Sequence, residues 1–133
     1  MNLDTSSFPL PIGARLKKIL EAELSRAGRP LGQGLTVTFR DGSYDAARGG
    51  YHPVEIALSA TGKVLYVTDF VLVGSPPYDE LVKELDFDAS LGLFQQAGVD
   101  YPLEEGAELF ALWQHNFCLY YRMGVYTVEV RPL

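Results

Sequence analysis

The run from Val64 to Val73 restricts the fold more than any other feature of this sequence. Its ten residues are aliphatic, aromatic or β-branched except for one charged residue, Asp69. The run is roughly half as long as a membrane-spanning helix needs to be. Because it is apolar on both faces, it predicts a strand that is central in a sheet and is either covered on both sides or strongly curved around a helix.

Three shorter segments alternate between apolar and polar residues, as strands with one buried face do. They are residues 35–40, 54–59 and 126–131. Residues 60–63 form a short connection from the second of these segments to the apolar run, which predicts a β-hairpin. The polar side chains of the three segments should form a ladder of mixed charge on one sheet face: Thr36, Thr38, Arg40, Glu55, Glu129 and Arg131.

Apolar residues at helical spacing predict two long helices, at residues 12–27 and 102–123, each ending before a glycine. A shorter helix is predicted at Tyr78–Leu85, and one or two helical turns within residues 88–98. Residues 1–10 carry few periodic features and are predicted to be a loose lead-in.

The resulting order of elements, α-β-β-β-α-α-β, predicts an α+β protein with a single domain over residues 1–133. We expect a curved, mostly antiparallel sheet of four strands that packs on the helices in a roll-like architecture.

In the last predicted helix, a wheel at 100° per residue separates two faces. One face is predicted to be buried and carries Leu109, Leu112, Trp113, Phe117, Tyr120 and Tyr121. His115 lies on the opposite, solvent-facing side. Cys118 has no local motif and is predicted to be a partly buried, inert thiol.

The charge and cysteine content argue against several classes of partner. The chain has 17 acidic residues against 11 Lys and Arg, a net charge of -6, and no basic stripe. We therefore expect it to bind neither nucleic acid nor membranes. One cysteine cannot form an internal disulfide, and no secretory leader pattern is present, so a cytoplasmic location is expected.

No segment matches a known metal or phosphate motif. The loop that begins at Asp41 has Ala46 where a calcium loop needs Gly, and Arg48–Gly50 lacks the Lys and Ser or Thr of a phosphate loop. We therefore expect no metal and no cofactor, and Asp41 predicts an Asx-turn instead.

Three polar residues stand where burial is expected. The carboxylate of Asp69 must be paired, protonated or open to water; it either forms a salt bridge, for example to Arg40, or anchors a pocket. His52 is on the core-facing side of its strand and is either structural or a general base supported by Asp69 or Asp41. Asn116 lies on the apolar face of the last helix, where it bonds to backbone or a tyrosine hydroxyl, or faces a cavity.

Aromatic residues are numerous, with eight Tyr, seven Phe and one Trp. Tyr44 and Tyr51 flank the Gly49–Gly50 loop, and Tyr78 follows a Pro–Pro pair. Tyrosine and tryptophan are common anchors of interfaces, so these loop tyrosines are candidate binding residues. Lids over the ends of the core would also account for them.

Several short motifs of the sequence resemble those of a small bacterial family, domain of unknown function 2787 (DUF2787). They are Phe39–Asp41, Gly49–Ile56, Thr68–Phe70, Glu84–Asp88, Gly92–Phe94, Tyr120–Tyr121, Met123–Tyr126 and Val128–Val130. The resemblance covers nearly the whole chain, and the run from Gly49 to Glu55 is its most specific part. It implies a compact α+β domain in a bacterial cytoplasm, and it implies no activity.

The leading hypothesis is a non-catalytic binding module that holds a protein or a small molecule in an aromatic-rich cleft between the sheet and the last helix, or on the loop surface. Its candidate binding residues are His52, Asp69, Tyr44, Tyr51, Tyr78 and Asn116, and no catalytic residue is assigned. The first alternative is a small enzyme with His52 and Asp69 as an acid–base pair. The second is a structural homodimer without a ligand.

Overall fold

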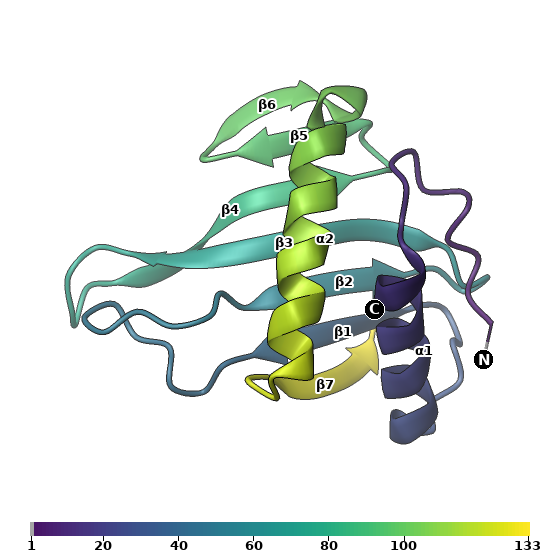
Figure 1. Ribbon diagram of the computed structural model, residues 1–133, viewed down its shortest axis with the longest axis horizontal. Helices are drawn as coiled ribbons and strands as arrows, with labels where there is room; N and C mark the ends of the chain where they lie inside the picture. The colour runs from purple at the N-terminus through teal and green to yellow at the C-terminus, as the bar shows by residue number, and fades with distance from the viewer. Residues whose placement is uncertain (1) are drawn as a thin grey trace.

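Two helices lie over one antiparallel sheet in the computed structural model, which describes residues 2–133 (Figure 1). The elements in chain order are α1 Ala14–Ala27, β1 Leu35–Arg40, β2 Val54–Leu58, β3 Val64–Val73, β4 Glu80–Asp88, β5 Leu93–Gln96, β6 Val99–Pro102, the 3-10 helix η1 Leu103–Gly106, α2 Ala107–Arg122 and β7 Thr127–Pro132. Across the described residues the strand order is β6-β5-β4-β3-β2-β1-β7, and every neighbouring pair is antiparallel. The predicted α+β class is confirmed.

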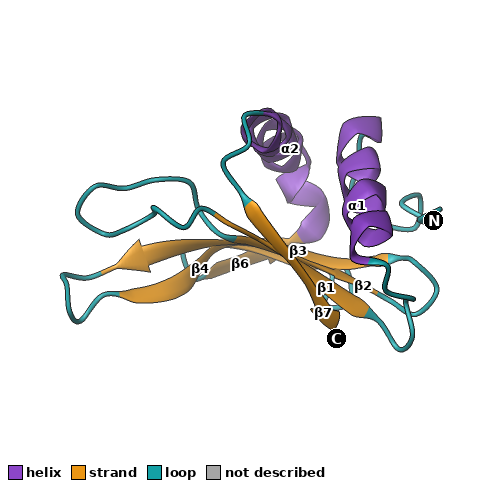
Figure 2. Cartoon of the chain, turned by 90° about the horizontal axis from the view of Figure 1, so that it is seen from below, coloured by secondary structure: helices purple, strands orange, loops and turns teal. Residues whose placement is uncertain are grey.

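The apolar run forms β3, which lies in the middle of the sheet between β2 and β4, as predicted. Helices cover only one of its faces, so of the two alternatives for this strand, cover on both sides is wrong (Figure 2). The register of β3 shifts at Ala57/Leu58 against β2 and at Asp69/Phe70 against β4. A β-bulge bends a strand and redirects side chains, so the second shift bears directly on the surroundings of Asp69.

The sheet has seven strands rather than the predicted four, because two segments predicted as helical are strands. The segment 78–85 contributes to β4. In this strand Leu85 and Phe87 face the helices, while Asp86 and Asp88 face the other way. The alternation was not recognised in the sequence because the apolar residues of 78–85 also fit helical spacing. Within residues 88–98 the chain forms the β5–β6 hairpin. Its two turn residues, Ala97 and Gly98, both have positive φ, which suits a tight hairpin turn.

Both long helices are found close to their predicted positions, α1 two residues shorter at its start and α2 preceded by η1. The prediction of a loose lead-in is wrong for the described residues 2–10, and Met1 lies outside them. Leu3, Phe8 and Leu10 are buried in the core, and Asp4 pairs with Lys63 in an isolated bridge. Apolar side chains at those three positions give the segment enough buried surface to be fixed in place.

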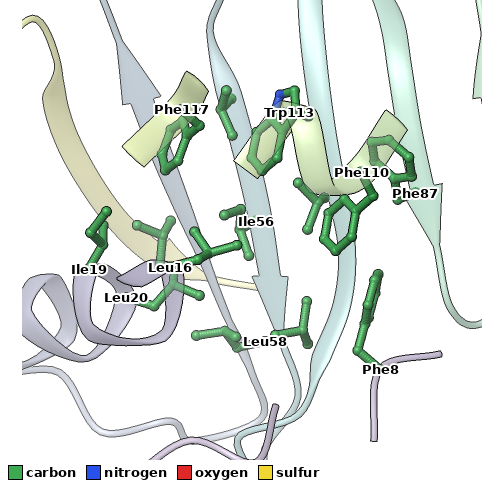
Figure 3. Close-up of a cluster of buried hydrophobic side chains, with 14 of the residues drawn as sticks. Phe8, Leu16, Ile19, Leu20, Ile56, Leu58, Phe87, Phe110, Trp113 and Phe117 are labelled. Atoms are coloured by element: carbon green, nitrogen blue, oxygen red, sulfur yellow. The ribbon is translucent and has the colours of Figure 1, made fainter. Parts of the chain in front are cut away.

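The core lies between the two helices and the sheet (Figure 3). The buried face of α2 is rotated slightly from the prediction: Leu112 is 58% exposed, whereas Phe110, which the wheel left out, is fully buried. Gln114 is also buried, and both ends of its carboxamide are paired: the oxygen accepts the Gly13 N–H and the NH₂ donates to the Pro11 carbonyl oxygen. The residues at the start of α1 therefore pack on this side of α2, and the buried face of α2 includes Gln114.

The other face of the sheet is not covered by a helix (Figure 2). The predicted polar ladder is aligned there, with Thr38 between Glu55 and Glu129 and Thr36 opposite Arg131. Glu55 accepts a hydrogen bond from the Tyr66 hydroxyl. None of the helices formed by residues 2–133 has both the length and the apolar character needed to cross a membrane.

Candidate functional site

A cavity of about 320 Å³ opens between α2, the middle of the sheet and the loop before β2. Its lining residues come from segments far apart in the sequence: Gly50, Tyr51, His52, Val54, Asp69, Trp113, Asn116, Phe117, Tyr120 and Tyr126. Four of the six candidate binding residues named from the sequence are among them: Tyr51, His52, Asp69 and Asn116.

His52 and Asp69 are in direct contact at the base of this cavity. The His52 Nδ1 lies 2.8 Å from Asp69 Oδ1, and the other carboxylate oxygen of Asp69 accepts the Trp113 indole N–H at 3.0 Å. The register that places Val54 opposite Asp69 brings the two residues together, because His52 is two residues before Val54. The Asp69 side chain, 13% exposed, is thus held at both oxygens, and its basic partner is His52 rather than Arg40.

The loop that carries His52 is fastened at three points. The Asp41 carboxylate accepts the Ser43 N–H with one oxygen, the predicted Asx-turn, and the Tyr51 N–H with the other. The Tyr44 hydroxyl accepts the Leu72 N–H at 2.9 Å, which ties the loop to β3. Gly50 has φ of 141°, and a Cβ there would lie 2.9 Å from both Asp41 Oδ2 and the Tyr44 Cα. Only glycine lets the loop close so tightly.

Five of the ten residues that line the cavity are Phe, Tyr or Trp. The rings of Trp113 and Phe117 stack with centroids 5.0 Å apart, and Phe117 in turn stacks on Tyr126. The rings of Tyr51 and Tyr120 are 4.7 Å apart and join the loop to α2. The indole nitrogen of Trp113 lies at the edge of the core cluster, which leaves it free to reach Asp69 (Figure 3).

Two polar groups of the wall have no protein partner among the described residues. The carboxamide of Asn116 makes no hydrogen bond within residues 2–133, although it lines the cavity and is half-buried. The Nε2 of His52 makes none either, since its contacts are all through Nδ1. Of the alternatives for Asn116, the geometry is that of a residue facing a cavity.

Two ionisable groups of the cavity have shifted pKa values. The hydrogen bond to Asp69 raises the pKa of His52 above 6.5, against a smaller opposing effect of burial, and the charges of Asp69 and Glu84 add to the increase. Burial raises the pKa of Tyr126, with the Asp69 carboxylate as the next contribution. Asp69 thus contributes to both shifts, as the largest cause at His52 and the second cause at Tyr126.

Sequence reasoning missed Glu84, whose Oε2 lies 3.0 Å from the same His52 Nδ1. Glu84 is the extra residue of β4 at the register shift, since Asp69 pairs with Leu85 and Phe70 with Lys83. The bulge places its carboxylate beside His52 instead of on the opposite face. A bulge leaves no reliable mark in a single sequence, so no signal could have found this residue.

The remaining candidates take other positions. Tyr44 packs behind the site, its ring centroid 5.5 Å from that of His52, and does not line the cavity. Tyr78 lies in the turn that connects β3 to β4, is 87% exposed and does not line the cavity. Asp41 supports the loop rather than pairing with His52.

The fold and the cavity define a small α+β protein in which an aromatic pocket carries a fixed His–Asp pair. The family model described as "Protein of unknown function (DUF2787)" matches residues 14–131, nearly the whole chain. The chain therefore belongs to the DUF2787 family, as its sequence motifs predicted.

Two solved structures, both from Vibrio cholerae, are similar over nearly their whole length. The hypothetical protein VC0508 from the VSP-II pathogenicity island is 34% identical with a TM-score of 0.82, and the match covers 96% of this chain and 99% of that one. The conserved hypothetical protein VC1805 from pathogenicity island VPI-2 is 34% identical with a TM-score of 0.79, covering 92% and 95%. VC1805 is described as sharing structural homology with the human P32 protein. No curated protein matches the sequence.

Proposed function

We propose that this protein binds a small planar molecule in the aromatic cavity, and that the ligand carries an amide-like polar edge. The observation that carries the proposal is the carboxamide of Asn116, which faces an aromatic cavity without a hydrogen-bond partner among residues 2–133. A carboxamide offers both a donor and an acceptor, and both of these groups of the half-buried Asn116 are open to a molecule in the cavity. An amide-like edge of a ring would complement both groups.

The walls support a flat ligand. The partly exposed rings of Tyr51 and Tyr120 present aromatic surface to the cavity, and the stacked, largely buried pair of Trp113 and Phe117 completes its lining. Binding pockets for small molecules are mostly apolar with a few well-placed polar groups. The volume of about 320 Å³ is near the lower end of the range for such pockets, which favours a molecule of one or two rings.

The polar groups of the site are also held in place before any ligand arrives. Asp69 is fixed by Trp113 and His52, and the backbone of Tyr51 is fixed by Asp41. A prearranged site avoids the entropy cost of ordering side chains on binding. This rigidity favours a specific pocket over an accidental gap in packing.

Uracil, nicotinamide and hypoxanthine are suitable probes, because each combines a planar ring with an amide-like edge. In ¹H–¹⁵N spectra of the metal-free protein, we expect at least one of them to shift the Trp113 indole and Asn116 carboxamide signals, with a dissociation constant of about 1 mM or tighter. Acetamide, which has the amide without the ring, should shift neither. Asn116→Leu should weaken binding by about tenfold or more, since it removes both hydrogen bonds.

His115→Leu is the matched control, because His115 is the neighbour of Asn116 on α2 and is exposed outside the cavity. It should leave binding of the probe unchanged. If none of the three rings shifts these signals at about 10 mM, or if Asn116→Leu binds as the wild type does, the proposal is wrong.

A small enzyme remains the second candidate, because one further observation favours it. His52 lines the cavity, its Nδ1 is oriented by Asp69, and its Nε2 has no hydrogen-bond partner among the described residues, which is the arrangement of a general base. The described lining contains no Ser, Thr or Cys, so the nucleophile would be water. Hydrolysis of p-nitrophenyl acetate that His52→Ala abolishes and His115→Ala leaves intact would favour this candidate.

A further inference from the structure

Three potential metal ligands meet at one side of the cavity. His52 Nδ1 is 2.8 Å from Asp69 Oδ1 and 3.0 Å from Glu84 Oε2, and the ligand atoms of all three residues lie within 4.8 Å of one another. The residues come from the loop before β2, from β3 and from the bulge of β4. Their side chains are 33%, 13% and 42% exposed, so the cluster is accessible to an ion from solvent.

The second carboxylate is not explained by the His–Asp pair alone. A single ring nitrogen carries one proton, and that proton is directed at Asp69. Glu84 lies within contact distance of the same nitrogen without a hydrogen bond to it, and its carboxylate has no other hydrogen bond within residues 2–133. An imidazolium between two carboxylates would balance part of the charge, and the remaining lone pairs of Glu84, which is 42% exposed, stay open to water or to an ion.

We propose that His52, Asp69 and Glu84 bind a single divalent transition-metal ion, Zn²⁺ being the ion that suits them best. One imidazole nitrogen and two carboxylate oxygens are ligands that Zn²⁺ accepts, and three protein ligands with one open position are characteristic of its reactive sites. Two carboxylates also balance the charge of the ion. The open position would be available to water or to a molecule in the cavity that His52 and Asp69 line.

The surroundings supply the second layer of contacts that metal sites normally have. Asp69 is oriented by the Trp113 indole N–H on its other oxygen, and partners of this kind commonly fix metal-bound carboxylates. Bond lengths of about 2.0–2.1 Å in a tetrahedral site separate neighbouring ligand atoms by about 3.3 Å. The observed 2.8 and 3.0 Å would therefore open by a few tenths of an ångström, which the partly exposed side chains of His52 and Glu84 can accommodate.

The metal site does not depend on the proposed ring-shaped ligand. With Nδ1 bound to the ion, the proton of neutral His52 is on Nε2. The two proposals therefore fail separately: ring binding is measured with metal removed, and metal binding is measured with no ring present.

Titration of the EDTA-treated, dialysed protein with ZnCl₂ by isothermal calorimetry tests the inference. We expect one ion per chain with a dissociation constant in the micromolar range or tighter, and no detectable heat with MgCl₂ at the same concentrations. Zn²⁺ should also shift the Trp113 indole signal in the ¹H–¹⁵N spectrum, since that group contacts Asp69. Glu84→Gln and His52→Ala should each weaken binding by at least about tenfold.

The chain offers a control for adventitious binding. His115 and Cys118 line the groove between α1 and α2, and the double variant His115→Ala/Cys118→Ser removes the remaining imidazole and the thiol. Zn²⁺ binding should be unchanged in it. Glu84 is exposed enough that Glu84→Gln should keep the wild-type melting temperature in EDTA, which separates loss of a ligand from loss of folding.

Three outcomes would overturn the inference. They are no Zn²⁺ binding up to about 1 mM, binding that survives Glu84→Gln and His52→Ala, and binding that is lost in the His115/Cys118 variant. The first would leave the cluster as an ion pair, and the other two would place the ion elsewhere on the protein.

Discussion

Replacement of Trp113 by Ala is expected to lower the free energy of unfolding by about 3–5 kcal/mol, which is much of the stability of a domain this size. The indole is buried, stacks between Phe110 and Phe117, and donates its N–H to Asp69. The substitution removes apolar surface, leaves a cavity beside the existing one, and frees an oxygen of a largely buried carboxylate. Urea denaturation followed by circular dichroism measures the effect.

Leu112→Ala is the matched control for this prediction. Leu112 is the preceding residue on α2 but is largely exposed, so its loss should change the unfolding free energy by about 0.5 kcal/mol or less. Equal effects of the two substitutions, or a larger effect at Leu112, would contradict the helix rotation and with it the position of the cavity wall.

Asp69→Asn should destabilise the protein by about 1–3 kcal/mol, with the shape of the side chain kept. Asp69 accepts two N–H groups, from His52 and Trp113, and an asparagine can accept only one of them and must turn its own NH₂ toward the other. Denaturation in EDTA, with the exposed edge-strand residue Asp100 replaced by Asn as control, measures the difference. A variant as stable as the wild type would mean that the pair is strained for function rather than structural.

The destabilisation should depend on pH in a defined direction. Because the folded-state pKa of His52 is raised above 6.5, the contact with Asp69 contributes stability that is fully present below pH 6.5 and is lost as the pH rises through the folded-state value. The His52 part of the loss in Asp69→Asn should therefore be larger at pH 5.5 to 6 than at high pH, where only the hydrogen bond from neutral His52 remains. The hydrogen bond from Trp113 contributes at both ends of this range.

Local sequence patterns were sufficient to predict the strands and helices that are buried on one face only. Alternation in residues 35–40 and 54–59 and helical spacing in residues 12–27 each reflect burial on one side, and the structure confirms these elements. The same reasoning failed at residues 78–85, where Leu81, Val82 and Leu85 also fit helical spacing. There the long partner strand β3 supplies a hydrogen-bonding edge, and tertiary pairing outweighs local preference.

The candidate site was predictable in part for a similar reason. Asp69 is conspicuous because a charge interrupts an apolar strand, and Asn116 because an amide lies among aromatic residues on a helix. Their convergence with His52 depends on the β2–β3 register and on the placement of α2 across the sheet, neither of which a local pattern encodes. Glu84 reaches the site only through a bulge.

The site depends on a His52 ring that is fixed through Nδ1 on Asp69 and whose Nε2 has no hydrogen-bond partner among the described residues. Long-range ¹H–¹⁵N correlation spectra of the histidine rings, recorded across pH in EDTA, test it most directly. The structure predicts that His52 titrates with a pKa above 6.5, that its neutral form keeps the proton on Nδ1, and that Asp69→Asn lowers this pKa. A His52 that titrates at or below 6.5, or whose pKa is the same in Asp69→Asn, would contradict the account.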